Sequence, residues 1–151
     1  MHEVVQELAA IGLGGNLGQP RVAFGHALDM LEAAGVRIVA RSRLYASRAW
    51  GLAGQPDFLN AVALVRTDLT PQALLDLCLQ AEHALGRQRT RPWGPRTIDL
   101  DLLFYGERVI QTPTLILPHP YLTQRDFVLA PLAELGVVLP ASFGGCTPEG
   151  L

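Results

Sequence analysis

The chain has 151 residues, of which 49% are hydrophobic and 17% are charged, and its formal net charge is −2. These values predict one globular domain over residues 1–151, and they argue against a disordered chain or a strongly basic nucleic-acid binder. No apolar run approaches the roughly 20 residues of a membrane span and no basic leader opens the sequence, so we expect a cytoplasmic protein without a membrane partner.

The first part of the chain alternates between strand and helix patterns. A short apolar run at residues 8–13 predicts a strand that ends in a glycine-rich turn at 14–18. Pro20 then opens a predicted helix to about Ala34, with apolar residues at helical spacing and Gly35 as its stop. The loose alternation of residues 36–45 predicts the next strand.

The pattern then repeats. Residues 58–66 form a second strand candidate, reached through a loop at 46–57 whose length and Gly, Pro and Trp content are typical of functional loops. Thr70 and Pro71 open a second predicted helix that ends near Leu85. An arginine-rich loop follows, and residues 99–105 predict the last strand.

The element order β-α-β-β-α-β predicts an α+β fold. It matches the ferredoxin-like βαββαβ core, in which helices pack on an antiparallel sheet. Many unrelated functions use this fold, so the candidate site has to decide the activity.

The most informative segment, residues 93–101, ends in Asp99 and Asp101. In an extended strand residues i and i+2 point to the same face, so these carboxylates should lie side by side. Such a pair repels unless a cation neutralises it, and Mg²⁺ suits oxygen ligands while keeping positions for substrate phosphates. The alternative is a solvated strand face or an ion pair with Arg96.

An arginine cluster precedes this pair and consists of Arg87, Arg89, Arg91 and Arg96. The guanidinium fork matches phosphate oxygens, so arginines beside a candidate Mg²⁺ site favour phosphoryl-group chemistry over the alternative of a solvated charged loop. The turn at residues 12–18 lacks the G-x-x-x-x-G-K-[ST] spacing, which excludes a P-loop kinase.

A series of motifs along the chain resembles one known family. The motifs are QPDFLNA at 55–61, LGRQR at 85–89, WGPRTIDLDLL at 93–103, LPHP at 117–120 and RDFVL at 125–129. Over about residues 11–139 the sequence is similar to the 6-hydroxymethyl-7,8-dihydropterin pyrophosphokinases of folate biosynthesis (2-amino-4-hydroxy-6-hydroxymethyldihydropteridine diphosphokinases).

The resemblance implies a diphosphotransferase that moves the β,γ-pyrophosphoryl group of ATP, as one unit, to the hydroxymethyl oxygen of the reduced pterin, giving AMP. It assigns two Mg²⁺ ions to Asp99 and Asp101 and catalytic roles to Arg87, Arg96 and Asp101. Asp101 is also the candidate to accept or relay the hydroxyl proton, although water is the alternative, since a metal-bound carboxylate is a weak base.

By the same resemblance the nucleotide would contact Glu82, Arg87, Arg89, Arg96, Thr97, Leu102, His119 and Arg125. The pterin would contact Ser47, Trp50, Phe58, Asn60, Trp93, Asp99 and Phe127. Aromatic faces suit a flat heterocycle and a side-chain amide suits its edge. Taken alone, Phe58 and Phe127 could equally be core residues, and a histidine between prolines is more often a turn residue.

The chain departs from the family pattern at Gly15, Arg48, Pro92 and Tyr121. Its tail after Pro140 is short, so we do not expect the C-terminal helix of some members. The loops at 46–57 and 86–93 are expected to close over ATP and pterin and exclude water. Nothing in the sequence demands a protein partner, so we expect a monomer.

Two other functions remain open from the residues. One is a ferredoxin-like binding module that uses residues 87–96 as an RNA or nucleotide-effector patch, against which the negative net charge and the lack of an RNP-type aromatic signature argue. The other is a different Mg²⁺-dependent phosphotransferase that uses the same aspartate pair on another acceptor.

Overall fold

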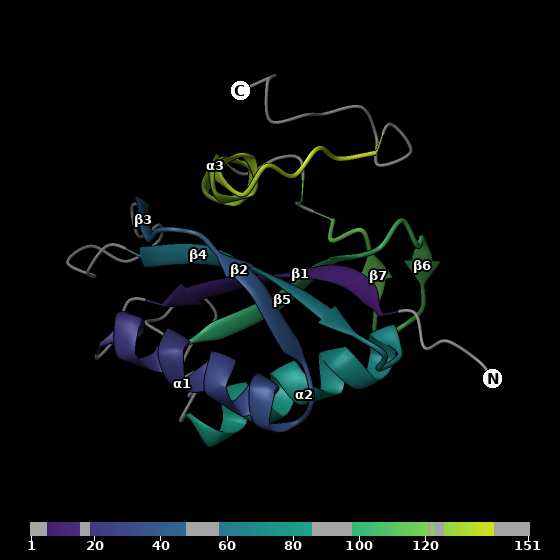
Figure 1. Cartoon of the computed structure of the whole chain (residues 1–151), viewed down its shortest axis with the longest axis horizontal. Helices are drawn as coiled ribbons and strands as arrows, with labels where there is room; N and C mark the ends of the chain where they lie inside the picture. The colour runs from purple at the N-terminus through teal and green to yellow at the C-terminus, as the bar shows by residue number, and fades with distance from the viewer. Residues whose placement is uncertain are drawn as a thin grey trace.

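The computed structural model describes residues 6–15, 19–47, 58–85, 98–120, 122 and 126–140. In this part of the chain two helices cover one face of an antiparallel sheet and a third helix lies over the other face (Figure 1). The helices are α1 (Pro20–Ala33), α2 (Pro71–Ala84) and α3 (Asp126–Glu134). The strands are β1 (Glu7–Gly15), β2 (Arg37–Arg41), β3 (Tyr45–Ser47), β4 (Phe58–Thr67), β5 (Asp99–Tyr105), β6 (Ile110–Gln111) and β7 (Ile116–Leu117).

The main sheet has the strand order β2-β4-β1-β5, and β3 also pairs with β4. All of these pairs are antiparallel, with β4 and β5 on either side of β1. Each of the first two helices connects strands that are separated by one intervening strand, which is the ferredoxin-like arrangement. The predicted α+β fold with helices packed on an antiparallel sheet is therefore confirmed. β6 and β7 form a separate two-stranded sheet.

The core has two parts, one on each side of the sheet. On the side of α1 and α2, Ile11 of β1 packs with Leu31 and Leu74 of the helices. On the side of α3, Val62 of β4 packs with Leu132. Because both faces of β4 are covered, its middle residues are almost all buried instead of alternating between buried and exposed.

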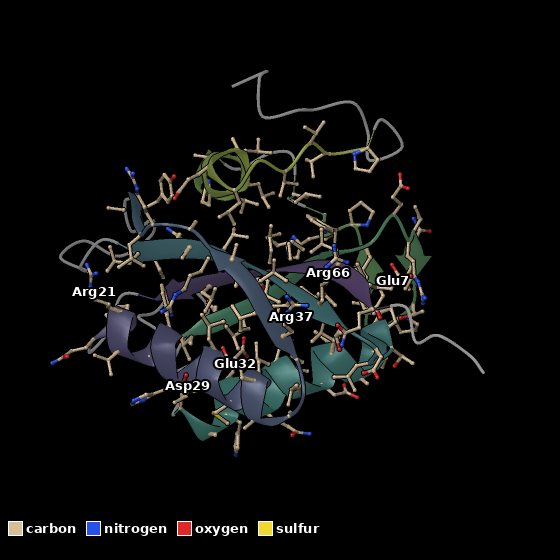
Figure 2. The ribbon with its side chains drawn as sticks, in the orientation of Figure 1. Glu7, Arg21, Asp29, Glu32, Arg37 and Arg66 are labelled. Atoms are coloured by element: carbon tan, nitrogen blue, oxygen red, sulfur yellow. The ribbon has the colours of Figure 1, made fainter. Side chains whose placement is uncertain are left out.

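Local signals set the ends of the helices. The Thr70 hydroxyl accepts a hydrogen bond from the Ala73 N–H at 3.1 Å, and Pro71 occupies the first turn of α2, where no N–H is needed. Gly35 follows α1 with a φ of +96°, a conformation that glycine adopts without steric cost. Asp29 and Glu32 lie on the exposed side of α1 (Figure 2).

The prediction of a single strand over residues 36–45 is wrong in one respect, because the structure has two strands there, β2 and β3. Ser42, between them, donates its N–H to the Val62 carbonyl at 2.9 Å, and its hydroxyl accepts from the Val62 N–H at 2.9 Å. A side chain that replaces a main-chain partner in this way interrupts the regular strand ladder. The sequence did not predict the helix α3 or the small β6–β7 sheet, because these elements are short and α3 contains Pro131.

None of the described helices combines the length and apolar character that a membrane crossing requires. The predictions for the tail after Pro140 lie outside the described residues.

Candidate active site

Asp99 and Asp101 lie on the same face of β5, as their spacing predicted. Asp99 is half-buried and Asp101 is exposed, whereas the intervening Leu100 and the following Leu102 are buried among the residues that pack against α1 and α2. The alternation arises because successive residues of a strand point to opposite faces. The carboxylate pair therefore belongs to the sheet face opposite α1 and α2.

Two glycines of β1 lie beside the aspartates. Gly12 is paired with Asp101 and Gly14 with Asp99, and directly opposite residues of an antiparallel pair share a face. Neither position has a Cβ, so β1 contributes no side chain beside either carboxylate, and we call Gly12 and Gly14 the glycine floor. A Cβ built on Gly14 would stand 3.2 Å from Oδ1 of Asn60. The sequence predicted Gly12 in a strand and Gly14 in a turn at 14–18, but β1 continues to Gly15, so the start of that turn is wrong. The sequence did not predict that both glycines lie beside the aspartates, although their i, i+2 spacing matches that of the aspartates.

Asn60 lies across Gly14 on the other side from Asp99, because Gly14 pairs with both residues. Neighbouring strands are about 4.8 Å apart, so the two residues are separated by about 10 Å along this row. The Asn60 side chain is 8% exposed, and its Nδ2 donates to the Tyr45 carbonyl at 3.4 Å. A carboxylate pair suited to a metal ion and a buried amide therefore lie on opposite sides of the glycine floor.

The other described pterin candidates lie near Asn60. Phe58 is half-buried and, two residues earlier on β4, shares the face of Asn60. Ser47 of β3 is paired with Phe58, just as Tyr45 is paired with Asn60. The main chain of Phe127 is in the first turn of α3, the helix over this side of the sheet (Figure 1). The structure describes only the main chain of Ser47 and Phe127.

Glu82 reaches β5 from the last turn of α2. It is 5% exposed, and its Oε1 accepts a hydrogen bond of 2.6 Å from the main-chain N–H of Leu100, the residue between the two aspartates. β5 is at the edge of the sheet, so this N–H needs a partner from outside the strand ladder. The geometry gives Glu82 a structural contact that the sequence did not predict.

The thiol of Cys78 is buried one turn before Glu82 on α2. Burial, with smaller contributions from the negative charges of Glu82 and Asp101, raises the pKa of Cys78 to about 12. A thiol with such a pKa stays protonated near neutral pH and is a poor nucleophile. Cys78 is therefore a core residue under the site.

His119 lies against the outer edge of β5. Its main-chain N–H donates a hydrogen bond to the Leu103 carbonyl at 2.8 Å, and its main-chain carbonyl accepts one from the Leu122 N–H at 3.0 Å. These bonds hold the main chain of His119 close to the strand that carries Asp101. The side chain of Leu102 is 3% exposed and belongs to the core, so a contact between Leu102 and a nucleotide would come from its main chain.

The remaining candidates lie outside the described residues, and their predicted roles stay predictions. They are Trp50, Arg87, Arg89, Trp93, Arg96, Thr97 and Arg125. The same holds for Arg91, for most of the loop at 46–57, for the loop at 86–93, and for the departures at Arg48, Pro92 and Tyr121.

Within the described part of the chain, no three or more His, Cys, Asp or Glu residues are grouped as a metal-binding cage. The donor set at β5 is instead a pair of carboxylates. Mg²⁺ is commonly bound by one or two protein carboxylates together with waters and substrate phosphates, so the carboxylate pair fits this ion.

Comparisons with known proteins agree with this arrangement. Residues 10–137 match the family model of 7,8-dihydro-6-hydroxymethylpterin-pyrophosphokinase. A 2-amino-4-hydroxy-6-hydroxymethyldihydropteridine pyrophosphokinase of Methylorubrum extorquens is 46% identical over 128 residues, which are 84% of this chain and 81% of the relative. An enzyme of the same name from Pseudomonas aeruginosa is 43% identical over 150 residues, 93% of each chain.

Solved structures share the fold. A Plasmodium falciparum HPPK-DHPS structure superposes with a TM-score of 0.73 at 13% identity, over 96% of this chain and 44% of that chain. An HPPK-DHPS structure in complex with substrates gives a TM-score of 0.72 over 96% of this chain and 42% of that chain. This chain thus spans less than half the length of those two solved chains. By its family match and its relatives, the chain belongs to the 7,8-dihydro-6-hydroxymethylpterin-pyrophosphokinase family.

Proposed function

We propose that this chain catalyses the reaction for which its family is named. It transfers the β,γ-pyrophosphoryl group of ATP to the hydroxymethyl oxygen of 6-hydroxymethyl-7,8-dihydropterin, giving AMP and the pterin diphosphate in folate biosynthesis. The observation that carries the proposal is the row of Asp99, Gly14 and Asn60 across three strands. This row places a carboxylate pair suited to Mg²⁺ on one side of the glycine floor and an amide suited to a heterocycle edge on the other.

Asp99 and Asp101 are the proposed ligands of two Mg²⁺ ions. Their positions on β5 support this, because a strand whose neighbouring residues are buried holds both carboxylates in fixed directions. When bound, Mg²⁺ neutralises charge on the triphosphate and orients its oxygens. Gly12 and Gly14 place no side chain of β1 beside the carboxylates, so β1 does not hinder the approach of substrate oxygens there.

The nucleotide is proposed to lie along the outer edge of β5. His119 supports this placement, since its main chain is bonded to Leu103 of that strand. Arg87 and Arg96 would hold the transferring group in line with the acceptor, and pyrophosphoryl transfer depends mainly on such positioning and charge neutralisation. The further nucleotide contacts proposed are Glu82, Arg89, Thr97, Leu102 and Arg125.

The pterin is proposed to lie over β4, with its ring edge on Asn60. Phe58 supplies an apolar face on the same strand, and Asp99 borders the site from β5. The aromatic rings of Trp50, Trp93 and Phe127 and the hydroxyl of Ser47 complete the proposed pterin contacts. Asp101 or a water accepts the proton of the hydroxymethyl group as its oxygen attacks.

The proposal treats residues 1–151 as one pyrophosphokinase domain that acts as a cytoplasmic monomer. The proposal assigns no site residue to a second copy of the chain.

The decisive experiment is identification of the nucleotide product after incubation of the purified chain with ATP, Mg²⁺ and 6-hydroxymethyl-7,8-dihydropterin. We expect AMP to appear in step with consumption of the pterin. Formation of ADP would mean a kinase that uses the aspartate pair on a different reaction. No turnover, with nucleotide binding retained, would favour a binding module.

A further inference from the structure

The end of α3 is fixed to the beginning of β3 through Glu134. Its Oε1 accepts a hydrogen bond of 2.6 Å from the Tyr45 hydroxyl. The main-chain N–H of Arg43 donates to Oε1 at 3.1 Å and to Oε2 at 3.3 Å. Glu134 therefore binds two groups, a phenol and an amide, on either side of Leu44.

These bonds set the direction in which the chain enters β3. On one side of the corner, Ser42 is bonded to Val62 of β4 through both its main chain and its hydroxyl. On the other side, Glu134 holds Arg43 and Tyr45. The Arg43 side chain is 88% exposed and its Nε is 3.9 Å from Oε2, so this ion pair contributes little and the hydrogen bonds carry the contact.

Tyr45 connects this corner to the candidate pterin site. Its main-chain carbonyl accepts from Nδ2 of Asn60 at 3.4 Å, and the two residues are directly paired between β3 and β4. With Nδ2 turned toward Tyr45, Oδ1 lies over Gly14, 3.2 Å from where a Cβ would stand. This hydrogen bond from Nδ2 to Tyr45 therefore helps to set which way the amide faces, and with it the donor and acceptor that Asn60 presents.

We propose that Glu134 is a positioning residue for the pterin: by fixing Tyr45 and the corner before β3, it fixes the carbonyl that orients the Asn60 amide. The inference rests on the proposed function, in which Asn60 reads the edge of the pterin. Glu134 acts from α3, the helix that lies over this face of the sheet (Figure 1).

Three variants separate this role from a general structural one. Glu134→Ala removes the acceptor of both bonds, Tyr45→Phe removes only the phenol hydroxyl, and Glu134→Gln keeps an acceptor oxygen without the charge. Glu32→Ala is the matched control, because Glu32 is an exposed glutamate on α1, on the opposite side of the sheet (Figure 2). For each variant, KM for the pterin, KM for ATP, kcat and the melting temperature are measured.

We expect Glu134→Ala to raise KM for 6-hydroxymethyl-7,8-dihydropterin about three- to tenfold, the effect of one hydrogen bond, with KM for ATP unchanged. Tyr45→Phe should shift the same constant in the same direction, and Glu134→Gln should restore it. An unchanged pterin KM in Glu134→Ala and Tyr45→Phe, or equal rises for both substrates, would overturn the inference. Failure of the wild-type chain to form AMP would instead overturn the proposed function, and this inference with it.

Discussion

The carboxylate of Glu82 accepts a hydrogen bond of 2.6 Å from the main-chain N–H of Leu100, between the two aspartates of β5. Removal of this acceptor leaves a buried N–H without that partner. We expect Glu82→Ala to lower the free energy of unfolding by about 1–3 kcal/mol. Glu82→Gln keeps an acceptor oxygen and should retain most of the stability. Urea unfolding of both variants measures the difference. Equal losses in the two variants would show that the charge, and not the hydrogen bond, matters.

The glycine floor of Gly12 and Gly14 can be tested by alanine substitution at each position. In Gly14→Ala the new Cβ would stand 3.2 Å from Asn60 Oδ1, so the amide has to shift. We expect KM for the pterin to rise about three- to tenfold, as for a weakened hydrogen bond. In Gly12→Ala the nearest atom is Leu103 Cδ2 at 3.4 Å, and the methyl lies beside Asp101. If Gly12→Ala weakens substrate binding, the change should therefore be a rise in KM for ATP. The reverse pattern would contradict the proposed placement of the two substrates.

The double variant Asp99→Ala, Asp101→Ala tests the carboxylate pair. If these residues hold Mg²⁺, several kcal/mol of charge stabilisation is lost, and turnover should fall by about a thousandfold or more. The melting temperature should stay near that of the wild type, because neither side chain is part of the core. Asp29→Ala, at an exposed position of α1, is the control (Figure 2). Retained turnover in the double variant would exclude Asp99 and Asp101 as the metal ligands. In a nucleotide or RNA binder without turnover, the double substitution would leave binding nearly unchanged.

Cys78 should resist modification in the folded protein. Its pKa is raised to about 12, so the fraction of reactive thiolate at pH 8 is very small, and the side chain is inaccessible. The measurement is the rate of reaction with a disulfide reagent in a Cys146→Ala background, in which Cys78 is the remaining thiol. Reaction should become fast only in denaturant. Rapid labelling of the native protein would mean that the core beneath the aspartates opens readily.

The contact between Tyr45 and Glu134 should stabilise the protein within a defined pH range. Its hydrogen bond lowers the pKa of Glu134 from 4.5, so the contribution of the carboxylate is present above pH 4.5 and is lost as pH falls through the lowered value. The same bond raises the pKa of Tyr45 from 10.0, so the contribution of the phenol is present below pH 10.0 and is lost as pH rises through the raised value.

The wild type should therefore have a higher melting temperature than Glu134→Ala, and the difference should be largest between these two pH limits. Thermal unfolding of both proteins across the pH range gives the comparison. A constant difference down to strongly acidic pH would show that the ionised carboxylate is not what Tyr45 and Arg43 bind.

The sequence by itself determined the helices and strands of the ferredoxin-like core. It also predicted that Asp99 and Asp101 share a face, and it identified the family. These features depend on local patterns: proline and threonine at the start of α2, apolar residues at helical spacing, and the two-residue period of a strand. The divided strand at residues 36–45 was missed, because its cause is a bond from Ser42 to Val62, a residue far along the chain.

Only the tertiary structure decided what lies beside the aspartates. The pairing of β1 with both β4 and β5 puts Gly14 between Asn60 and Asp99. The packing of α2 brings Glu82 to the Leu100 N–H, and that of α3 brings Glu134 to Tyr45. Strand register and helix packing join residues distant in sequence through the burial of both sheet faces. No local pattern specifies those contacts, since they depend on the whole core forming at once.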